Sequence, residues 1–321
     1  MTVLRRNMTR TSISEFARFK IEGQRFVCLT AYDAPTARIL EAASVPMILV
    51  GDSVGNVVLG YRDTVPVTME IMLHHTAAVR RGAPLTFVVA DMPFGSFQIS
   101  DEEAVRNAVR LVQESGADAV KVEGAGARIS TIEQIVAAGI PVMGHLGLTP
   151  QNATQLGGFR VQGADAASAE RLIADARALE SAGVFSMVLE CVPEEVAALV
   201  TERVSVPTVG IGAGRQCDGQ VLVLHDLIGI SSGYSPRFVR AYAAVEEQIT
   251  HAVTAFSKDV ADGSFPGDGE VFSMSEHALS ALRRALPPVE NSPKTESAES
   301  GSLASEKGKT KKHPVRDGRS S

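Results

Sequence analysis

The stretch Val120-Lys-Val-Glu-Gly124 places two charged residues inside an otherwise apolar, β-branched run. In a strand, Lys121 and Glu123 point to one face and Val120 and Val122 to the other, because successive side chains alternate. An outward face covered by helices would bury both charges. We therefore expect the valines to face helices and the charged pair to point inward. The alternative for the pair is a purely structural ion pair at the rim of the sheet.

Seven other short apolar runs have the same character, and helix-forming stretches separate them. The eight candidate strands are Phe26–Thr30, Met47–Gly51, Leu85–Ala90, Ala119–Glu123, Val142–His145, Met187–Glu190, Thr208–Ile211 and Val221–Leu224. Apolar strands alternating with helices are typical of a parallel sheet covered on both faces. Eight such units in roughly 200 to 250 residues predict an α/β fold, a (β/α)₈ TIM barrel, which we place at residues 13–286.

A doubly wound open sheet is the alternative fold. Its dinucleotide-binding turn needs a fuller glycine spacing than Gly210-Ile-Gly-Ala-Gly214 provides. These glycines could let a ligand approach the backbone, or they could only form a tight turn. Among the helix signals, Ser100 with Glu103 and Ser130 with Glu133 predict capping boxes.

The composition indicates one large globular domain. Of 321 residues, 45% are hydrophobic, which is enough for a sizeable core. The net charge of -6 gives no basic excess for nucleic-acid binding. Cys28, Cys191 and Cys217 lack the spacing of a disulfide framework or a metal clip. With no apolar signal segment and no window that could span a bilayer, we expect a cytoplasmic protein with no membrane partner.

The two ends differ from this domain. Residues 1–12 are expected to be a flexible N-terminus. Residues 287–321 are rich in Pro, Ser, Glu, Lys and Gly, and such a segment cannot bury enough apolar surface to offset its ordering entropy. We predict a disordered tail there.

Polar residues stand where strands end, and a parallel barrel carries its active site at that edge. They are Asp52 and Ser53, Asp91, Lys121 and Glu123, His145, and Glu190. Convergent carboxylates from Asp52, Asp91 and Glu123 would repel one another without a cation. Oxygen ligands without cysteine favour Mg²⁺, with some of the carboxylates binding through water.

Glu190 stands apart on a later strand. Its apolar neighbours Leu189 and Cys191 would make this carboxylate more basic, which suits a general base. The alternative is a carboxylate that caps the next helix. His145 either orients a substrate or bonds to the backbone, and the sequence does not choose between the two.

Eight segments, in order along the chain, resemble ketopantoate hydroxymethyltransferase, also called 3-methyl-2-oxobutanoate hydroxymethyltransferase. They are Thr30–Asp33, Val50–Gly55, His75–Gly82, Ala90–Phe94, Val120–Gly124, Gly144–Pro150, Leu189–Pro193 and Val209–Gly214. The resemblance runs from about Ile13 to Gly267.

The resemblance implies a barrel of the phosphoenolpyruvate mutase and isocitrate lyase type. It also implies the first committed step of pantothenate synthesis, in which 3-methyl-2-oxobutanoate, 5,10-methylenetetrahydrofolate and water give 2-dehydropantoate and tetrahydrofolate. Family members are usually homo-oligomers, often decamers.

The same resemblance assigns roles to individual residues. Asp52 and Asp91 would hold Mg²⁺ and contact the substrate, and Glu123 would belong to the metal shell. Lys121 and Ser53 would bind the substrate. Glu190 would accept the proton, with His145 as a possible supporting residue.

One position departs from the family pattern, and two other functions compete with this one. Ala164 stands where the family often has arginine, which puts loop or folate contacts in doubt. A Mg²⁺-dependent carbon–carbon lyase of the same superfamily would carry a cysteine before Gly144-His145, where this chain has Val142-Met143. The second rival is a ligand-sensing barrel without turnover, which the intact set of acidic residues argues against.

Overall fold

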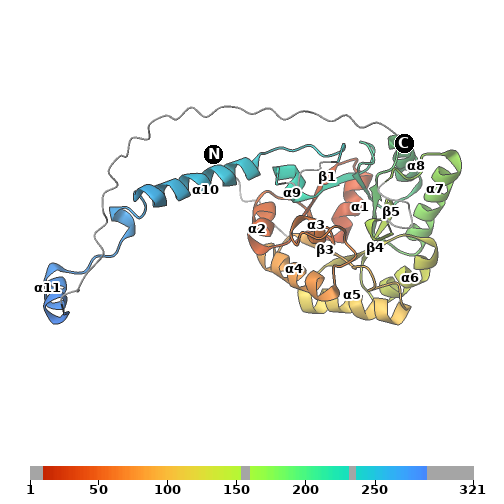
Figure 1. The fold of residues 1–321 in the computed structure, drawn as a ribbon. Helices are drawn as coiled ribbons and strands as arrows, with labels where there is room; N and C mark the ends of the chain where they lie inside the picture. The colour runs from red at the N-terminus through yellow and green to blue at the C-terminus, as the bar shows by residue number, and fades with distance from the viewer. Residues whose placement is uncertain (1–9, 153–159, 231–235, 288–321) are drawn as a thin grey trace, which may run out of the picture. The chain divides into compact units, whose positions relative to one another are not determined.

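The computed structural model describes residues 10–152, 160–230 and 236–287 (Figure 1). Residues 1–9 of the predicted flexible N-terminus and residues 288–321 of the predicted tail lie outside this part of the chain. In Figure 1 the strands lie in the middle of a ring of helices.

Eight parallel strands form a closed barrel in sequence order, with β1 paired to β8. They are β1 (Phe26–Thr30), β2 (Met47–Val50), β3 (Phe87–Asp91), β4 (Ala119–Glu123), β5 (Val142–Gly147), β6 (Ser186–Glu190), β7 (Thr208–Ile211) and β8 (Gly219–Leu222). The predicted barrel is confirmed, and the open doubly wound sheet is wrong. The last strand begins and ends two residues earlier than predicted, and Leu224 instead begins a helix.

The helices alternate with the strands over most of the chain. They are α1 (Ile13–Ile21), α2 (Ala34–Ala42), α3 (Val54–Val57), α4 (Met69–Gly82), α5 (Asp101–Ser115), α6 (Ile129–Ala137), α7 (Ala166–Ser181), α8 (Glu194–Arg203), α9 (Leu224–Ile228), α10 (Val245–Asp262) and α11 (Glu276–Ala285). Short 3₁₀ turns lie at Gly126–Arg128, Pro150–Asn152 and Asp268–Glu270.

The chain divides into two compact units between Ser257 and Lys258, inside α10. The first unit contains all eight strands, and the second contains α11. Among the described helices, none has both the length and the apolar character that crossing a membrane requires.

The structure confirms the serine half of one predicted capping box and corrects the other box. Ser100 caps α5, because its hydroxyl accepts a hydrogen bond from the Glu103 backbone N–H at 3.2 Å. Ser130 lies inside α6 and caps nothing there. Its hydroxyl donates to Asp101 Oδ2 at 2.8 Å instead, so a partner on the neighbouring helix α5 replaces the expected local bond.

The connection from β7 to β8 breaks the alternation, because residues 212–218, all of which are described, contain no helix. Gly212 and Gly214 have φ values of +62° and +76°, and these conformations turn the chain tightly. A Cβ on Gly212 would meet the Phe238 ring at 2.7 Å, and one on Gly214 would meet Glu194 at 2.4 Å. The glycines therefore form a turn between strands against packed side chains.

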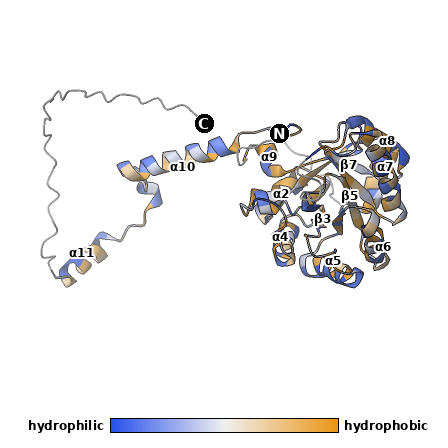
Figure 2. Cartoon of the chain, turned by 45° about the vertical axis from the view of Figure 1, so that its right-hand side comes forward, coloured by the Kyte–Doolittle hydropathy of each residue, from blue (hydrophilic) through white to orange (hydrophobic). Residues whose placement is uncertain are grey.

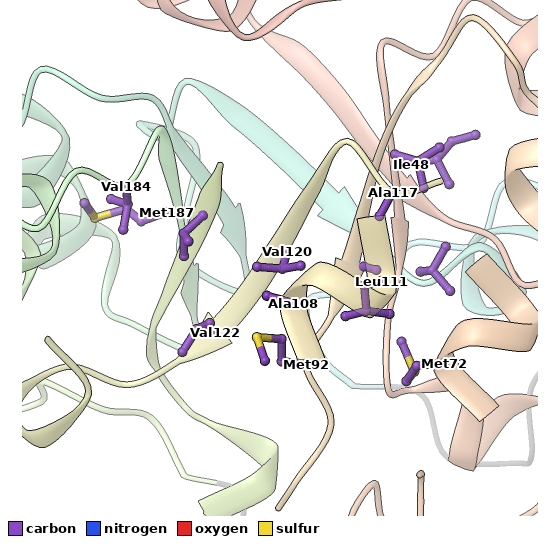
Figure 3. Close-up of a cluster of buried hydrophobic side chains, with 14 of the residues drawn as sticks. Ile48, Met72, Met92, Ala108, Leu111, Ala117, Val120, Val122, Val184 and Met187 are labelled. Carbon is purple, nitrogen blue, oxygen red and sulfur yellow. The ribbon is translucent and has the colours of Figure 1, made fainter. Parts of the chain in front are cut away.

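Two apolar layers lie on opposite faces of the strands. The outer layer, part of which Figure 3 shows, includes Ile48, Val120, Val122 and Met187 and packs under the helices. In Figure 2 the surrounding helices carry both hydrophilic and hydrophobic residues. This distribution is expected of helices that cover a sheet with one face only.

The inner layer fills the barrel from its amino-terminal end. Phe16 on α1 is fully buried, and its ring centroid lies 5.3 Å from that of Phe26 and 5.2 Å from that of Phe87. Because Phe26 and Phe87 begin their strands, α1 closes this end of the barrel. The opposite end is left for the polar side chains.

Candidate active site

All the side chains that the sequence analysis singled out line one cavity at the carboxyl ends of the strands. They are Asp52, Ser53, Asp91, Lys121, Glu123, His145 and Glu190. The strand register aligns them, with Asp91 beside Lys121 and Glu123 beside His145. The cavity holds about 150 Å³, well below the 300 Å³ or more typical of sites for drug-sized ligands.

Lys121 and Glu123 point into the barrel, and Val120 and Val122 belong to the outer apolar layer, as predicted. Lys121 Nζ lies 3.0 Å from Asp91 Oδ1 and 3.9 Å from Glu123 Oε1. Lys121 is only 4% exposed, so these carboxylates replace the stabilisation that water would otherwise give its ammonium group.

Each of the three neighbouring carboxylates has one oxygen held by an N–H group. Asp91 Oδ2 accepts from the Asp52 backbone N–H at 3.0 Å. Asp52 Oδ2 accepts from Gln151 Nε2 at 2.9 Å, and Glu123 Oε2 accepts from the Gln151 backbone N–H at 3.2 Å. Asp91 Oδ1 and Glu123 Oε1 are buried, and each pairs with a cationic group: Asp91 Oδ1 with Lys121 Nζ at 3.0 Å, and Glu123 Oε1 with His145 Nδ1 at 3.3 Å.

His145 lies between the carboxylate cluster and Glu190. Its Nε2 is 3.1 Å from Glu190 Oε2, and its Nδ1 is 3.3 Å from both Glu123 Oε1 and Lys121 Nζ. The contact with Glu123 suits a protonated Nδ1, whereas the contact with Lys121 suits an unprotonated one. The imidazole therefore contacts three side chains of the site rather than the backbone.

Burial and charge shift the pKa values of this cluster in opposite directions. Burial, then the charges of Asp91 and Glu123, raise the pKa of Asp52 well above its ordinary value. Burial opposes the charged form of Glu123, but His145 and Lys121 outweigh it and lower the pKa of Glu123. Burial and Lys121 oppose the charged form of His145, yet Glu123 and Glu190 raise its pKa to about 9.

Lys121 is held in its charged state. Burial alone would lower its pKa, but the charges of Asp91, Glu123 and Asp52 raise the pKa above its ordinary value. With Glu190 included, four carboxylates face two cationic groups, Lys121 and His145. When all four carboxylates are ionised, two negative charges are left over, which equals the charge of one divalent cation.

The donor set suits a hard dication. The crowding of three buried carboxylates, the raised pKa of Asp52 and the excess negative charge are each relieved by such an ion. Among the described residues, however, no three His, Cys, Asp or Glu side chains form a ready-made cluster of metal ligands. The two observations agree for Mg²⁺, which binds directly to one or two carboxylates and keeps several waters.

Two residues of this site were not predicted from the sequence. Gln151, directly after Pro150, contacts two of the carboxylates. Tyr32, two residues after β1, is 2% exposed, and its hydroxyl lies 2.8 Å from Ser53 Oγ. Tyr32 lies in Thr30–Asp33, one of the segments that resemble the family, and a tyrosine shortly after a predicted strand could have marked it. A neutral amide in a loop carries no such pattern.

Glycines make room for the carboxylates. A Cβ on Gly51 would lie 2.7 Å from Ser53 Oγ and 3.5 Å from Asp91 Oδ2. At the end of β5, Gly147 has φ +92°, and a Cβ there would lie 2.1 Å from the backbone oxygen of Glu190. The position of Glu190 therefore depends on the absence of a side chain at residue 147.

Solved structures of similar fold belong to distant proteins. A 2,3-dimethylmalate lyase, described as a PEP mutase/isocitrate lyase superfamily member, is 18% identical, with a TM-score of 0.53, covering 86% of this chain and 96% of that chain. A phosphonopyruvate hydrolase solved with oxalate and Mg²⁺ is 15% identical, with a TM-score of 0.54, covering 85% and 96%. At these identities the likeness concerns the fold, and it agrees with the barrel type that the sequence predicted.

Curated relatives are much closer in sequence. The chain is 54% identical over 269 residues to a 3-methyl-2-oxobutanoate hydroxymethyltransferase of Geobacillus sp. (strain WCH70), covering 84% of this chain and 96% of the relative. It is 52% identical over 269 residues to the protein of the same name from Bacillus cereus (strain AH187), covering 84% and 97%. The family model described as ketopantoate hydroxymethyltransferase matches residues 10–268. The chain therefore belongs to the ketopantoate hydroxymethyltransferase family.

Proposed function

We propose that this protein transfers a hydroxymethyl unit from 5,10-methylenetetrahydrofolate to 3-methyl-2-oxobutanoate, giving 2-dehydropantoate and tetrahydrofolate. This is the first committed step of pantothenate synthesis, and we place it in the cytoplasm. Family membership supports the reaction. The observation that carries it is that Glu190 lines the same cavity as the carboxylate cluster but contacts that cluster through His145.

Asp52, Asp91 and Glu123 are the residues that would hold Mg²⁺. When bound, the ion would withdraw charge from the ketone oxygen of a 2-oxo acid and so acidify the neighbouring carbon. A distant protein of this fold has been solved with Mg²⁺ and oxalate, an acid with paired oxygens like those of a 2-oxo acid. Asp52 and Asp91 would also contact the substrate.

Lys121 and Ser53 would bind the 2-oxo acid. The Lys121 ammonium offers a fixed positive charge inside the cavity, where an oxyanion develops as the neighbouring carbon loses its proton. Ser53 Oγ is oriented by the Tyr32 hydroxyl, 2.8 Å away. These groups are in place before the substrate arrives.

Glu190 would remove the proton from C3 of the oxo acid. The electron pair of that C–H bond forms the C2–C3 double bond of an enolate, which then attacks the methylene carbon of the folate. Before this attack, water adds to the methylene carbon and the two C–N bonds that hold it break, so tetrahydrofolate leaves with the two protons of the water and the carbon keeps its oxygen. The alkoxide formed by the attack takes the proton held on Glu190, which completes the hydroxymethyl group on C3. His145 would support this step, because its Nε2 lies 3.1 Å from Glu190 Oε2 and holds the carboxylate toward the cavity.

Deuterium exchange tests the assignment of the base. Incubation of 3-methyl-2-oxobutanoate with the protein and Mg²⁺ in D₂O, without folate, should give deuterium at C3, followed by NMR. Glu190→Gln should slow this exchange by about 10²- to 10⁴-fold, the usual contribution of a general base. Undiminished exchange in Glu190→Gln would remove Glu190 as the base. Product formation that needs no folate in wild-type protein would refute the proposed reaction.

We also propose that the protein works as a homo-oligomer, a homodecamer by its family resemblance. Among the residues of α10, all of which are described, none is buried. Ile249, Val253 and Val260 are each about half exposed and recur at intervals of four and seven residues. An exposed apolar stripe with this period supports a helix that packs against another copy of the chain.

A further inference from the structure

We propose that Gln151 is a positioning residue that fixes the carboxylates of Asp52 and Glu123 for a divalent cation. This inference rests on the proposed function, since it concerns the same metal site. Gln151 is 5% exposed and lies in the 3₁₀ turn Pro150–Asn152 that follows β5.

Gln151 holds two carboxylates from two different strands. Its Nε2 donates to Asp52 Oδ2 at 2.9 Å, and its backbone N–H donates to Glu123 Oε2 at 3.2 Å. Asp52 follows β2 and Glu123 ends β4. One residue therefore sets the rotation of both carboxylates, and the second oxygen of each is not bound to Gln151.

The orientation of the Gln151 amide is determined by its partners. Nε2 also donates to the backbone oxygen of Met92 at 2.9 Å, and neither Met92 O nor an ionised Asp52 can donate a hydrogen bond. A flipped amide would place its oxygen against both acceptors. The observed orientation is therefore the one that both acceptors, Met92 O and Asp52 Oδ2, allow.

The oxygen of the same amide is anchored in turn. Gln98 Nε2 lies 3.3 Å from Gln151 Oε1 and donates to it. Gln98 Oε1 accepts from the backbone N–H groups of Gly95 at 2.8 Å and Phe97 at 3.3 Å. The loop after β3 thus braces the amide, and outer partners of this kind typically change metal affinity 10- to 100-fold when they are removed.

The chemistry of these contacts indicates a role at a metal site rather than packing alone. Gln151 supplies its donors to two carboxylates that repel each other across the cavity. Glu123 Oε1 and Asp91 Oδ1 face the cationic groups His145 Nδ1, at 3.3 Å, and Lys121 Nζ, at 3.0 Å. A dication beside these carboxylates relieves the repulsion that remains on Asp52.

Metal titration tests the inference. Wild-type protein, Gln151→Met and Gln151→Asn would be titrated with Mn²⁺, and the free ion would be followed by electron paramagnetic resonance. Methionine keeps the length of the side chain without its donors, and asparagine keeps the amide but is too short to reach Asp52. We expect both variants to bind Mn²⁺ 10- to 100-fold more weakly than wild type. Gln162→Met, which changes a partly exposed glutamine outside the carboxylate cavity, should bind like wild type.

A second readout separates positioning from a general folding defect. In Gln151→Met, the Mg²⁺ concentration for half-maximal activity should rise 10- to 100-fold, with kcat at saturating Mg²⁺ much less affected. Variants that bind Mn²⁺ within twofold of a wild-type protein that itself binds would overturn the inference alone. Lower kcat with an unmoved Mg²⁺ midpoint would do the same. Failure of wild-type protein to bind Mn²⁺ would overturn the metal part of the proposed function and this inference with it.

Discussion

Lys121 sits among three carboxylates, with its Nζ 3.0 Å from Asp91 Oδ1. A buried charge that loses its partner is strongly destabilising, because neither water nor a counter-ion replaces the lost interaction. The same ammonium would stabilise an oxyanion in the cavity. Lys121 therefore contributes both to stability and to catalysis, and a substitution there should affect both.

Lys121→Met tests this double role. We expect the free energy of unfolding, measured by urea denaturation without metal, to fall by about 3 to 5 kcal/mol. At a temperature where the variant is folded, kcat/KM should fall by about 10²- to 10³-fold. Lys20→Met is the control, since Lys20 pairs with Asp218 at 2.8 Å outside the cavity. It should lose stability with little change in kcat/KM, and an equal catalytic loss in both variants would contradict the assignment.

His145 should make the metal-free protein less stable as pH rises. Its pKa is raised to about 9 from an ordinary value of 6.5, so the folded protein binds the proton more tightly than the unfolded chain. The stabilisation is fully present below about pH 6.5 and is lost as pH rises through about 9. Urea denaturation in a chelator at pH 6 to 9.5 should show a loss on the order of 3 kcal/mol relative to His145→Gln. A constant difference between the two proteins over this range would contradict it.

At the level of elements, the strand ends aim the side chains. The interval of two residues on β4 directs Lys121 and Glu123 into the cavity, and the end of β5 lies against the end of β6. Gly147 pairs with Glu190 across that junction. The geometry of the base therefore depends on how closely two backbones approach.

Gly147→Ala should displace the end of β6 and reduce activity. An added Cβ would lie 2.1 Å from the Glu190 backbone oxygen, where backbone must move. Gly139→Ala is a matched control, because Gly139 also has a positive φ, +85°, but a Cβ there would meet nothing within 4 Å. The control should lose about 1 to 2 kcal/mol of stability with normal kcat. Gly147→Ala should lose more stability and, in addition, most of its C3 exchange activity; equal behaviour of the two would contradict this account.

At the level of the whole molecule, the exposed stripe on α10 predicts the state of assembly. Val253→Glu places a charge on the stripe and should shift the protein to a smaller species in sedimentation velocity. His251→Glu places the same charge on another face of the helix and should leave the assembly intact. A wild-type protein that sediments as a monomer would refute the proposed oligomer. An unchanged assembly in Val253→Glu would show that the stripe lies outside the interface.

The sequence predicted the barrel well because buried strands appear as short apolar runs that alternate with helix-forming stretches. This pattern placed Ala119–Glu123 and Thr208–Ile211 with the bounds that the structure has. The end of the last strand was wrong, since Val223 and Leu224 continue the apolar run into α9 and no polar residue marks the boundary.

The acidic residues of the site were predictable, whereas their supporting contacts were not. A charge in an apolar strand stands out, and parallel strands bring such charges to one edge. Gln151 and Gln98 lie in connecting segments, where an amide is as common on a solvated surface as in a buried network. Their contacts depend on loop conformations, which no interval in the sequence encodes.

The three carboxylate side chains are held in fixed orientations before an ion binds. A mobile side chain gives up about 0.5 to 1.5 kcal/mol of rotational freedom when it is immobilised in a complex. Here the N–H anchors on Asp52, Asp91 and Glu123 impose that loss during folding. Binding of an ion therefore requires little movement of these side chains. The distances between the carboxylate oxygens that the N–H groups do not hold then favour ions of one radius over others.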